Sequence, residues 1–328
     1  MRDVKQVAVL GAGGLGRNMA RLLSHKKSMR LVAICDTEGC AFRSSGISHE
    51  EIDAIPPGNS VAALLEIGVH SSEPINHLLQ NHADIDGIFF ALPNLPNEFI
   101  PETIDRIIAS GYKGVIVDAL KRTTAVEMVL QRREALAAAG ITYITGCGAT
   151  PGLLTAVAAL AAQSFVEVED VTIWFGVGIG NWDAYRATIR EDIAHLAGFD
   201  VNKVAAMSDA EIEIELDRRN GLLELVNMEH ADDVMLEVAG VVPRGRVKVG
   251  GLVDTRNPTK PVSTSVKVTG VTFEGKRSTH TFTLGDETSM AANVNGPALG
   301  YMNTGFWLKQ QGIAGIFTSA DLMPRFPS

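Results

Sequence analysis

Residues 5–36 read KQVAVLGAGGLGRNMARLLSHKKSMRLVAICD, and this stretch decides the fold. An apolar segment at 5–10 runs into a glycine-rich turn, and residues 17–26 then show the apolar spacing of a helix. A second apolar segment, 30–36, ends on Asp36. The order predicts a strand–turn–helix–strand unit, the opening of a parallel sheet that binds a dinucleotide.

The glycine-rich turn has the spacing of a dinucleotide fingerprint. Gly11 allows a tight turn, Gly13 lets the backbone approach a pyrophosphate, and Gly16 lets the helix pack closely on the strand. Gly14 and Leu15 open the helix, whose free N–H groups and positive dipole end favour a phosphate. Such a turn alone could be purely structural, but here the strand, the helix and the acid fall in register. We therefore predict an NAD(P) site.

The choice between NAD and NADP is left open by the sequence. Asp36 ends the second strand and is placed to accept hydrogen bonds from the adenosine ribose, which favours NAD. Arg43 lies close enough in the chain to meet the 2′-phosphate of NADP instead. No HExxH segment, paired CxxC segment or EF-hand loop occurs, so we expect no metal.

Strands and helices continue to alternate after this unit. Strands are predicted at 86–91, 115–120 and 141–145, and helices at 103–110 and 125–139. This order predicts a parallel sheet with right-handed crossovers, in which ligands bind beyond the carboxyl ends of the strands. The residues expected at those ends, facing the cofactor, are Leu92, Pro93, Asn94, Lys121 and Cys147.

The second half of the chain has a different pattern. Thr150 and Pro151 suit the first positions of a helix at 153–162. Strand-like segments follow, interrupted by an acidic, helix-rich stretch, and the tail resembles one long helix. The predicted strands are 169–176, 244–252, 262–272 and 279–284, the acidic stretch is 209–224, and the tail helix is 289–311.

These patterns predict an α/β fold with two domains. Residues 1–148 form an NAD(P)-binding Rossmann domain with a parallel sheet, and 149–288 form an α+β domain with a mostly antiparallel sheet for substrate and subunit contacts. Residues 289–328 return as a helix to the first domain. We also expect a homo-oligomer.

Composition excludes several classes of protein. The 328 residues are 46% hydrophobic and 20% charged, which is typical of globular proteins of about two domains. A net charge of −9 without a basic run argues against nucleic-acid binding. Three cysteines in no metal-binding spacing indicate a reducing compartment. The apolar runs are too short for a signal peptide or a membrane span, so a soluble cytoplasmic protein is expected.

Two residues at strand ends are candidate nucleophiles. Lys121 follows VIVDAL at 115–120, and an amine beside a nicotinamide could attack a carbonyl to form an imine within reach of a hydride. Alternatively, Lys121 is a solvated strand-end lysine or a phosphate contact. Cys147 could act as a thiolate, but small residues there also suit close approach to the nicotinamide, and that interpretation is preferred.

The second half contributes a candidate proton carrier. His230 stands among acids at 229–233 and could act as an acid or base, or be a surface histidine at a helix end. The loop at 175–186, with glycines, aromatic residues and Arg186, could bind a small carboxylate, or be an ordinary junction between a strand and a helix.

Several segments together resemble a known group of enzymes. These are the glycine fingerprint, VDALKR at 117–122, EHAD at 229–232 and GCGATPG at 146–152. With them, the chain resembles the saccharopine-dehydrogenase-like oxidoreductases and, within that group, the biotin-pathway family of 8-amino-7-oxononanoate synthases, or carboxylating dehydrogenases. The fingerprint is shared by many enzymes, whereas the lysine and histidine segments are more specific.

The resemblance implies an unusual reaction. A lysine of the protein, here Lys121, condenses with the ketone of 8-amino-7-oxononanoate, and NAD(P)H reduces the imine. The nitrogen captures CO₂ or bicarbonate as a carbamate, and NAD(P)⁺ then oxidises the lysine side of the C–N bond. Hydrolysis leaves the lysine as an aldehyde (allysine), so each protein molecule turns over once. His230 would match the family's second essential group.

Two other functions compete with this one. The first is a multiple-turnover NAD(P)-dependent amino acid or imine dehydrogenase of the saccharopine-dehydrogenase type, with Lys121 as an acid/base or substrate clamp. The second is a regulatory protein that senses NAD(P) without catalysis.

Overall fold

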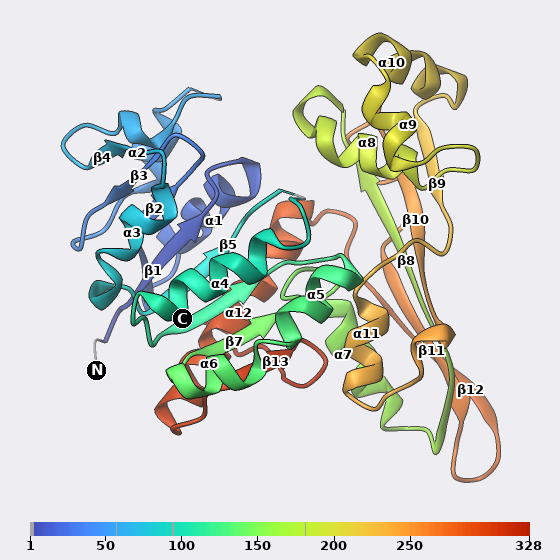
Figure 1. Ribbon diagram of the computed structural model, residues 1–328. Helices are drawn as coiled ribbons and strands as arrows, with labels where there is room; N and C mark the ends of the chain where they lie inside the picture. Colours follow the sequence, from blue (N-terminus) through green and yellow to red (C-terminus); the bar gives the residue numbers. More distant parts are fainter. Residues whose placement is uncertain (1–2, 57, 94, 181) are drawn as a thin grey trace. The chain divides into compact units, whose positions relative to one another are not determined.

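The glycine-rich stretch opens the larger sheet of a two-unit structure (Figure 1). The computed structural model describes residues 3–56, 58–93, 95–180 and 182–328. Unit 1 comprises Met1–Ala156 and Ala291–Ser328, and unit 2 comprises Val157–Met290. Residues 149–156, which the sequence assigned to the second domain, therefore belong with unit 1, and so does nearly all of the C-terminal tail.

The sheet of unit 1 has the strand order β13-β7-β6-β5-β1-β2-β3-β4. All its neighbouring strands are parallel except the antiparallel pairs β2–β3 and β3–β4. The predicted parallel sheet is confirmed, whereas the strands β3, β4 and β13 were not predicted. The strands are β1 Lys5–Leu10, β2 Met29–Cys35, β3 Gly39–Phe42, β4 Gly68–His70, β5 Gly87–Phe90, β6 Val115–Asp118, β7 Thr142–Thr145 and β13 Gly315–Thr318.

Helices cover both faces of this sheet. Val7 and Val9 of β1 belong to one core, with residues of α1 and α12, and Ala8 and Leu10 belong to the other, with residues of α3 and α4. Alternate strand residues thus enter opposite layers, as the pleat of a strand requires. The helices of unit 1 are α1 Gly14–Ser24, α2 His49–Asp53, α3 Pro74–Leu79, α4 Phe99–Ala109, α5 Thr123–Leu130, α6 Arg133–Ala139 and α12 Met290–Gln310. A further helix, α7 Leu153–Ala162, begins in unit 1 and continues in unit 2.

Two helix predictions need correction. The single helix expected at 125–139 is broken between α5 and α6, where the Arg132 guanidinium pairs with Asp105 of α4. The predicted cap of α7 is wrong, because the helix begins at Leu153, after a cis Thr150–Pro151 peptide bond. The residue that precedes the helix is Gly152, whose φ of +138° glycine tolerates and other residues rarely adopt.

Unit 2 contains a mixed sheet in the order β12-β11-β8-β10-β9. Only β8 and β10 run parallel among its described pairs, so the predicted mostly antiparallel sheet is confirmed. The acidic helical stretch ends earlier than predicted, because residues 222–225 form the strand β9. Its alternate residues Leu223 and Leu225 are buried in the core of unit 2. The elements are β8 Glu167–Gly178, β9 Leu222–Leu225, β10 Val247–Asp254, β11 Ser265–Val271, β12 Arg277–Thr283, α8 Arg186–Ala194, α9 Val201–Ala206, α10 Asp209–Arg218 and α11 Asp232–Val238.

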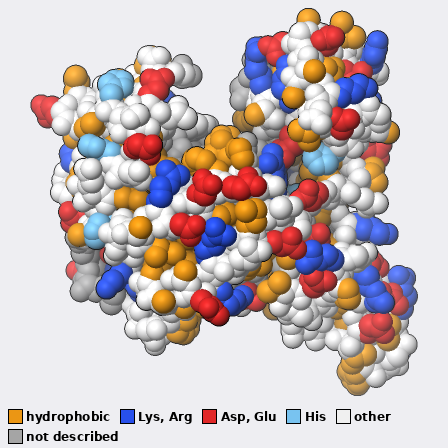
Figure 2. All heavy atoms as spheres, viewed as in Figure 1, with side chains coloured by type: hydrophobic (Ala, Val, Ile, Leu, Met, Phe, Trp, Pro, Cys, Tyr) orange, Lys and Arg blue, Asp and Glu red, His pale blue; other side chains and the backbone are white. Residues whose placement is uncertain are grey.

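The surface is mixed in charge. On the face shown in Figure 2, acidic and basic side chains are interspersed rather than gathered into one basic stripe. None of the helices in the described ranges combines the length and apolar character needed to cross a bilayer.

Candidate active site

The glycine loop between β1 and α1 has the shape that a dinucleotide needs. A Cβ atom on Gly11 would lie 2.3 Å from the Ala91 carbonyl oxygen, and one on Gly16 would lie 1.9 Å from that of Gly11. These two glycines therefore permit the tight turn and the close packing of α1. At Gly13 and Gly14, by contrast, a Cβ would meet nothing within 4 Å. That open space lies at the amino end of α1, where N–H groups attract a phosphate.

This contrast predicts opposite outcomes for two alanine substitutions. Gly13 has φ −73° and ψ −169°, which alanine adopts readily, so Gly13→Ala should change the free energy of unfolding by less than about 0.5 kcal/mol. The added methyl group should nevertheless weaken dinucleotide binding. Gly16→Ala should lower the free energy of unfolding by about 1–3 kcal/mol, because its Cβ clashes with backbone. Chemical denaturation and dinucleotide titration check both; equal stability losses would contradict the assignment.

Asp36, the predicted ribose acceptor, is engaged by the protein itself. Its Oδ1 accepts hydrogen bonds from the Glu38 N–H, the Gly39 N–H and the Ser60 hydroxyl, at 2.9, 3.1 and 2.8 Å. Its Oδ2 accepts one from the Val61 N–H at 2.7 Å. Because a carboxylate offers about four acceptor positions, little capacity remains for a ribose. The ribose contact at Asp36 stays a prediction.

Arg43, the alternative contact for a 2′-phosphate, is engaged as well. Its guanidinium forms an ion pair with Glu51 and donates to the Gly46 carbonyl at 2.7 Å. Both side chains predicted at the adenosine ribose, Asp36 and Arg43, are therefore engaged by the protein itself.

Lys121 lines a cavity at the carboxyl ends of the parallel strands. The cavity has a volume of about 60 Å³ and brings Lys121 together with Leu15 of the glycine loop and with Leu92 and Pro93, which follow β5. Four residues that the sequence predicted separately thus share one site. Asn94, predicted beside them, lies outside the described residues. The cavity is lined by Leu15, Phe90, Leu92, Pro93, Leu95, Pro96, Ile100, Asp118, Ala119, Leu120, Lys121, Arg122 and Ala125.

Arg122, next to the candidate lysine, has a structural contact. Its guanidinium donates a hydrogen bond of 3.0 Å to the carbonyl of Leu95, which also lines the cavity. The side chain therefore ties the segment after β5 to the turn that carries Lys121.

Asp118 holds the turn that presents Lys121, a role that was not predicted from the sequence. Its Oδ1 accepts hydrogen bonds from the Leu120 N–H at 2.9 Å and the Gly146 N–H at 2.8 Å. Its Oδ2 accepts one from the Tyr143 hydroxyl at 2.7 Å. The fully buried carboxylate thus joins the turn after β6 to the turn after β7. An acid at the end of an apolar strand was the signal available in the sequence.

Burial raises the pKa of Asp118, and the hydrogen bonds from Tyr143 and the backbone offset part of that effect. Between the unfolded pKa, about 4, and the raised folded value, only the folded state binds the proton, so stability falls as pH rises through that window. Relative to Asp118→Asn, the native protein should lose up to about 1.4 kcal/mol of stability per pH unit there. Urea denaturation from pH 4 to 8 measures the free energy of unfolding of both proteins. A difference between them that does not change with pH would contradict this prediction.

Cys147 is not available as a nucleophile in this structure. Its side chain is 0% exposed, its thiol lies 3.2 Å from the Ile144 carbonyl, and burial raises the pKa of that thiol. The preferred interpretation from the sequence, a small residue that allows close approach to the nicotinamide, stays a prediction. Any contact of Cys147 with a cofactor would involve its backbone.

His230 is a buried residue of unit 2, so the alternative of a surface histidine is wrong. The side chain is 4% exposed, and Nδ1 lies 2.6 Å from Oδ2 of Asp232, which is 0% exposed. A buried carboxylate on one ring nitrogen fixes the orientation of the imidazole. The role of His230 as an acid or base stays a prediction.

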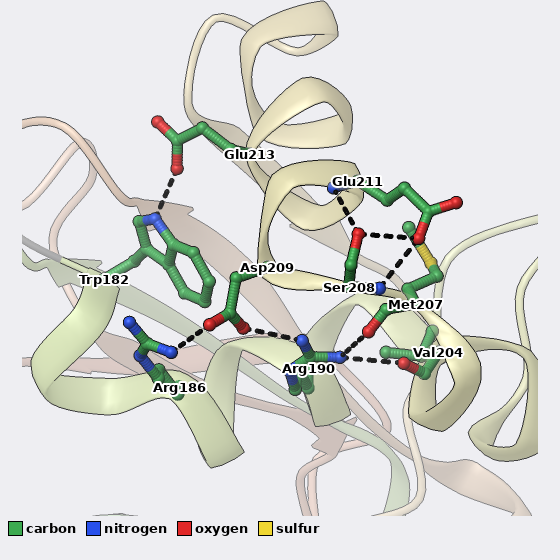
Figure 3. Close-up of polar contacts among 9 residues, drawn as sticks. All are labelled: Trp182, Arg186, Arg190, Val204, Met207, Ser208, Asp209, Glu211 and Glu213. Carbon is green, nitrogen blue, oxygen red and sulfur yellow. Dashed lines mark hydrogen bonds and ion pairs between the residues drawn. The ribbon is translucent and has the colours of Figure 1, made fainter.

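The loop before α8 lines a second cavity, of about 400 Å³, within unit 2. Arg186 pairs with Asp209, which also receives Arg190 at 2.8 Å, and the Trp182 indole donates to Glu213 (Figure 3). The hydrogen bond from Arg190 is the main cause that lowers the pKa of Asp209. Because Arg186 is already paired with a carboxylate of the protein, the predicted carboxylate-binding role of this loop gains no support.

No group of three His, Cys, Asp or Glu side chains in the described ranges is arranged to hold a metal ion. The features of the described residues that could take part in binding or catalysis are the glycine loop, the Lys121 cavity and the pair of His230 with Asp232.

Comparisons with known proteins agree with this geometry. No family model matches the chain. It is 44% identical over 352 aligned residues to "(S)-8-amino-7-oxononanoate synthase BioU" of Haloferax mediterranei, covering 99% of this chain and 100% of that protein.

Similar solved structures are dehydrogenases. Diaminopimelate (DAP) dehydrogenase of C. glutamicum in complex with DAP has a TM-score of 0.59 at 17% identity, covering 98% of this chain and 95% of that one. Saccharopine dehydrogenase of Saccharomyces cerevisiae has a TM-score of 0.56 at 11% identity, with 96% and 94% covered. At these identities the likeness establishes the Rossmann-type dehydrogenase fold.

Proposed function

The chain belongs to the family of (S)-8-amino-7-oxononanoate synthase BioU, and from this membership we propose that it aminates 8-amino-7-oxononanoate in biotin biosynthesis with Lys121 as the nitrogen donor. The observation that carries the proposal is the single cavity shared by Lys121 and Leu15 of the glycine loop. An amine at the carboxyl edge of a parallel sheet lies where a dinucleotide bound to that loop would direct its nicotinamide.

A nicotinamide dinucleotide fits the residues present. The glycine loop has open space at Gly13 and Gly14, and the adjacent helix N-terminus attracts a pyrophosphate. When bound, the nicotinamide supplies a hydride and later accepts one. The chain's own task is to place the Lys121 amine and the substrate ketone together beside it.

The Lys121 amine attacks the ketone and, with loss of water, forms an imine. Addition of a hydride and a proton gives a secondary amine, whose nitrogen then takes up CO₂ as a carbamate. Removal of a hydride from the lysine carbon regenerates a C=N bond, now to the lysine side. Water cleaves this bond, so the product leaves with the nitrogen of Lys121 and the protein keeps an aldehyde. One hydride is consumed and one is returned.

His230 is proposed as the proton carrier of this sequence. Imine formation requires a proton for the departing water, and the final hydrolysis requires removal of one. The carboxylate of Asp232 holds the ring at Nδ1, which leaves Nε2 for the exchange of protons.

The decisive experiment measures the mass of the protein after reaction. Full-length protein is incubated with NADPH or NADH, bicarbonate and 8-amino-7-oxononanoate, and intact and peptide masses are recorded. Conversion of the lysine to an aldehyde lowers the mass by about 1 Da, on the peptide that contains Lys121, in proportion to product. Unchanged mass over many turnovers would instead establish the multiple-turnover dehydrogenase, and dinucleotide binding without consumption of the ketone would establish a sensor.

A further inference from the structure

Arg17, in the first turn of α1, has a half-buried guanidinium that donates only to backbone carbonyls. Its Nε donates to the carbonyl of Ala12 in the glycine loop at 3.1 Å, and its Nη1 donates to the carbonyls of Ile52 and Ile55 at 2.9 and 2.8 Å. Its Nη2 lies 3.5 Å from the carbonyl of Asn59. Contacts to the glycine loop and to the chain around α2 thus hold the guanidinium in one place.

The charge of this guanidinium is not neutralised by an ion pair with any carboxylate in the described part of the chain. Asp53 lies within electrostatic reach of Arg17, but its carboxylate is paired with Arg21 at 2.9 Å. The guanidinium of an arginine stays protonated in proteins. A full positive charge therefore remains on a group that neutral carbonyls hold in a fixed position.

The charge lies beside the loop that would hold the diphosphate of a dinucleotide. Ala12, whose carbonyl accepts from Arg17, directly precedes Gly13 and Gly14, where a Cβ would meet nothing within 4 Å. Because neighbouring Cα atoms are about 3.8 Å apart, the guanidinium lies within about 10 Å of this open space. That distance is about the Debye length at 0.1 M salt, so the charge acts on an anion bound there.

The protein as a whole is acidic, with a net charge of −9, so its long-range field repels an anionic ligand. A dinucleotide carries two negative charges on its diphosphate. The free N–H groups at the start of α1 offer it the equivalent of only about half an elementary charge. A whole positive charge fixed beside the loop therefore adds to the attraction that the helix provides.

We propose that Arg17 attracts the diphosphate of the dinucleotide through its fixed positive charge. The inference deepens the proposed function, on which it rests. Arg17 acts through its charge rather than a direct contact, since four of its five N–H groups already serve carbonyls of the protein. The attraction therefore acts on any ligand that carries the diphosphate and not on a neutral nucleoside. A purely structural tie between the loop and the chain around α2 would affect both ligands alike.

The test compares a charged and a neutral probe on the full-length protein without substrate. Titration calorimetry measures ADP-ribose, which carries the diphosphate, and adenosine, which carries no charge and is measured by its displacement of ADP-ribose. Arg17→Gln keeps an amide that can donate to the carbonyls but removes the charge. It should weaken ADP-ribose binding by about tenfold at about 20 mM salt, less at about 300 mM, and leave adenosine binding unchanged. Arg17→Lys keeps the charge and should retain most of the affinity for ADP-ribose.

Two exposed residues supply variants that leave the carbonyl contacts of Arg17 intact. Lys27→Met changes the net charge as Arg17→Gln does, but beyond the other end of α1, and should leave both affinities unchanged. Asp53→Asn removes the acid within electrostatic reach of Arg17 and should tighten ADP-ribose binding by about two- to threefold at low salt.

Each outcome has a separate meaning. An equal loss of affinity for ADP-ribose and adenosine in Arg17→Gln overturns the inference, because the side chain then only supports the loop. Native affinity for ADP-ribose in Asp53→Asn at low salt also overturns it, whether or not the Arg17 variants fold. If NAD⁺, NADP⁺ and ADP-ribose all fail to bind the native protein, the dinucleotide site itself, and with it the proposed function, is wrong.

Discussion

Lys121→Ala is expected to form no product and to show no change in protein mass after incubation with substrate, bicarbonate and reduced dinucleotide. The variant lacks the nitrogen that the proposed reaction transfers, so no other side chain can restore the product. Lys121→Arg should be equally inactive, because a guanidinium stays protonated and does not form an imine. Product is measured by mass spectrometry in a single-turnover assay with stoichiometric protein.

A matched control lies at the other end of the same strand. Lys113 is exposed and precedes β6, whereas Lys121 follows it. Lys113→Ala should therefore retain full product yield and the mass loss at Lys121. Both lysine variants should bind the dinucleotide as the native protein does. Product from Lys121→Ala at more than trace levels would exclude Lys121 as the donor and would support the ordinary dehydrogenase.

His230→Ala is expected to slow the single turnover by about 10²- to 10⁴-fold, the usual contribution of a positioned acid or base. It should leave dinucleotide affinity unchanged, because the glycine loop belongs to unit 1. The rate is followed by quenched-flow mass measurement of Lys121 modification. Because removal of the histidine leaves the buried Asp232 without this partner, rates are recorded well below the unfolding temperature of the variant.

Two further variants separate chemistry from folding. His195, an exposed histidine of the same unit, should be replaceable by alanine without a change in rate. Asp232→Asn keeps a hydrogen-bonding group at Nδ1 but removes the negative charge, and it should reduce the rate less than loss of His230 does. A native rate in His230→Ala would contradict the proton-carrier role and leave the pair of His230 with Asp232 as a structural contact.

Much of the fold was predictable because its signals are local. Strand and helix periodicity are carried by contiguous residues, so the parallel sheet of unit 1 and the mostly antiparallel sheet of unit 2 were both predicted. The errors occurred where distant residues intervene. The pairing of Arg132 with Asp105 accompanies the break between α5 and α6, and the unpredicted strand β13 joins the sheet by pairing with β7, far from it in the chain.

The site was predictable in part for the same reason. Lys121, Leu92 and Leu15 could be placed at one edge because parallel strands carry their carboxyl ends to the same side of a sheet. Asp118 was overlooked because its role depends on Tyr143 and Gly146, which belong to the neighbouring strand and its turn. The sequence contains only an acid at the end of a strand, whereas in the structure this carboxylate is a buried link between two turns.

By itself, the sequence determined the glycine turn, the alternation of strands and helices, and a lysine at a strand end, since each is encoded within a few neighbouring residues. Only the tertiary structure decided which polar groups are already satisfied. It engages Asp36 with Ser60 and Val61, buries His230 against Asp232, and brings Asn295 to Leu15 across 280 positions of the chain. Burial makes each polar atom without a hydrogen bond costly, so the hydrogen-bond partners that the folded chain supplies determine which polar groups remain for a ligand.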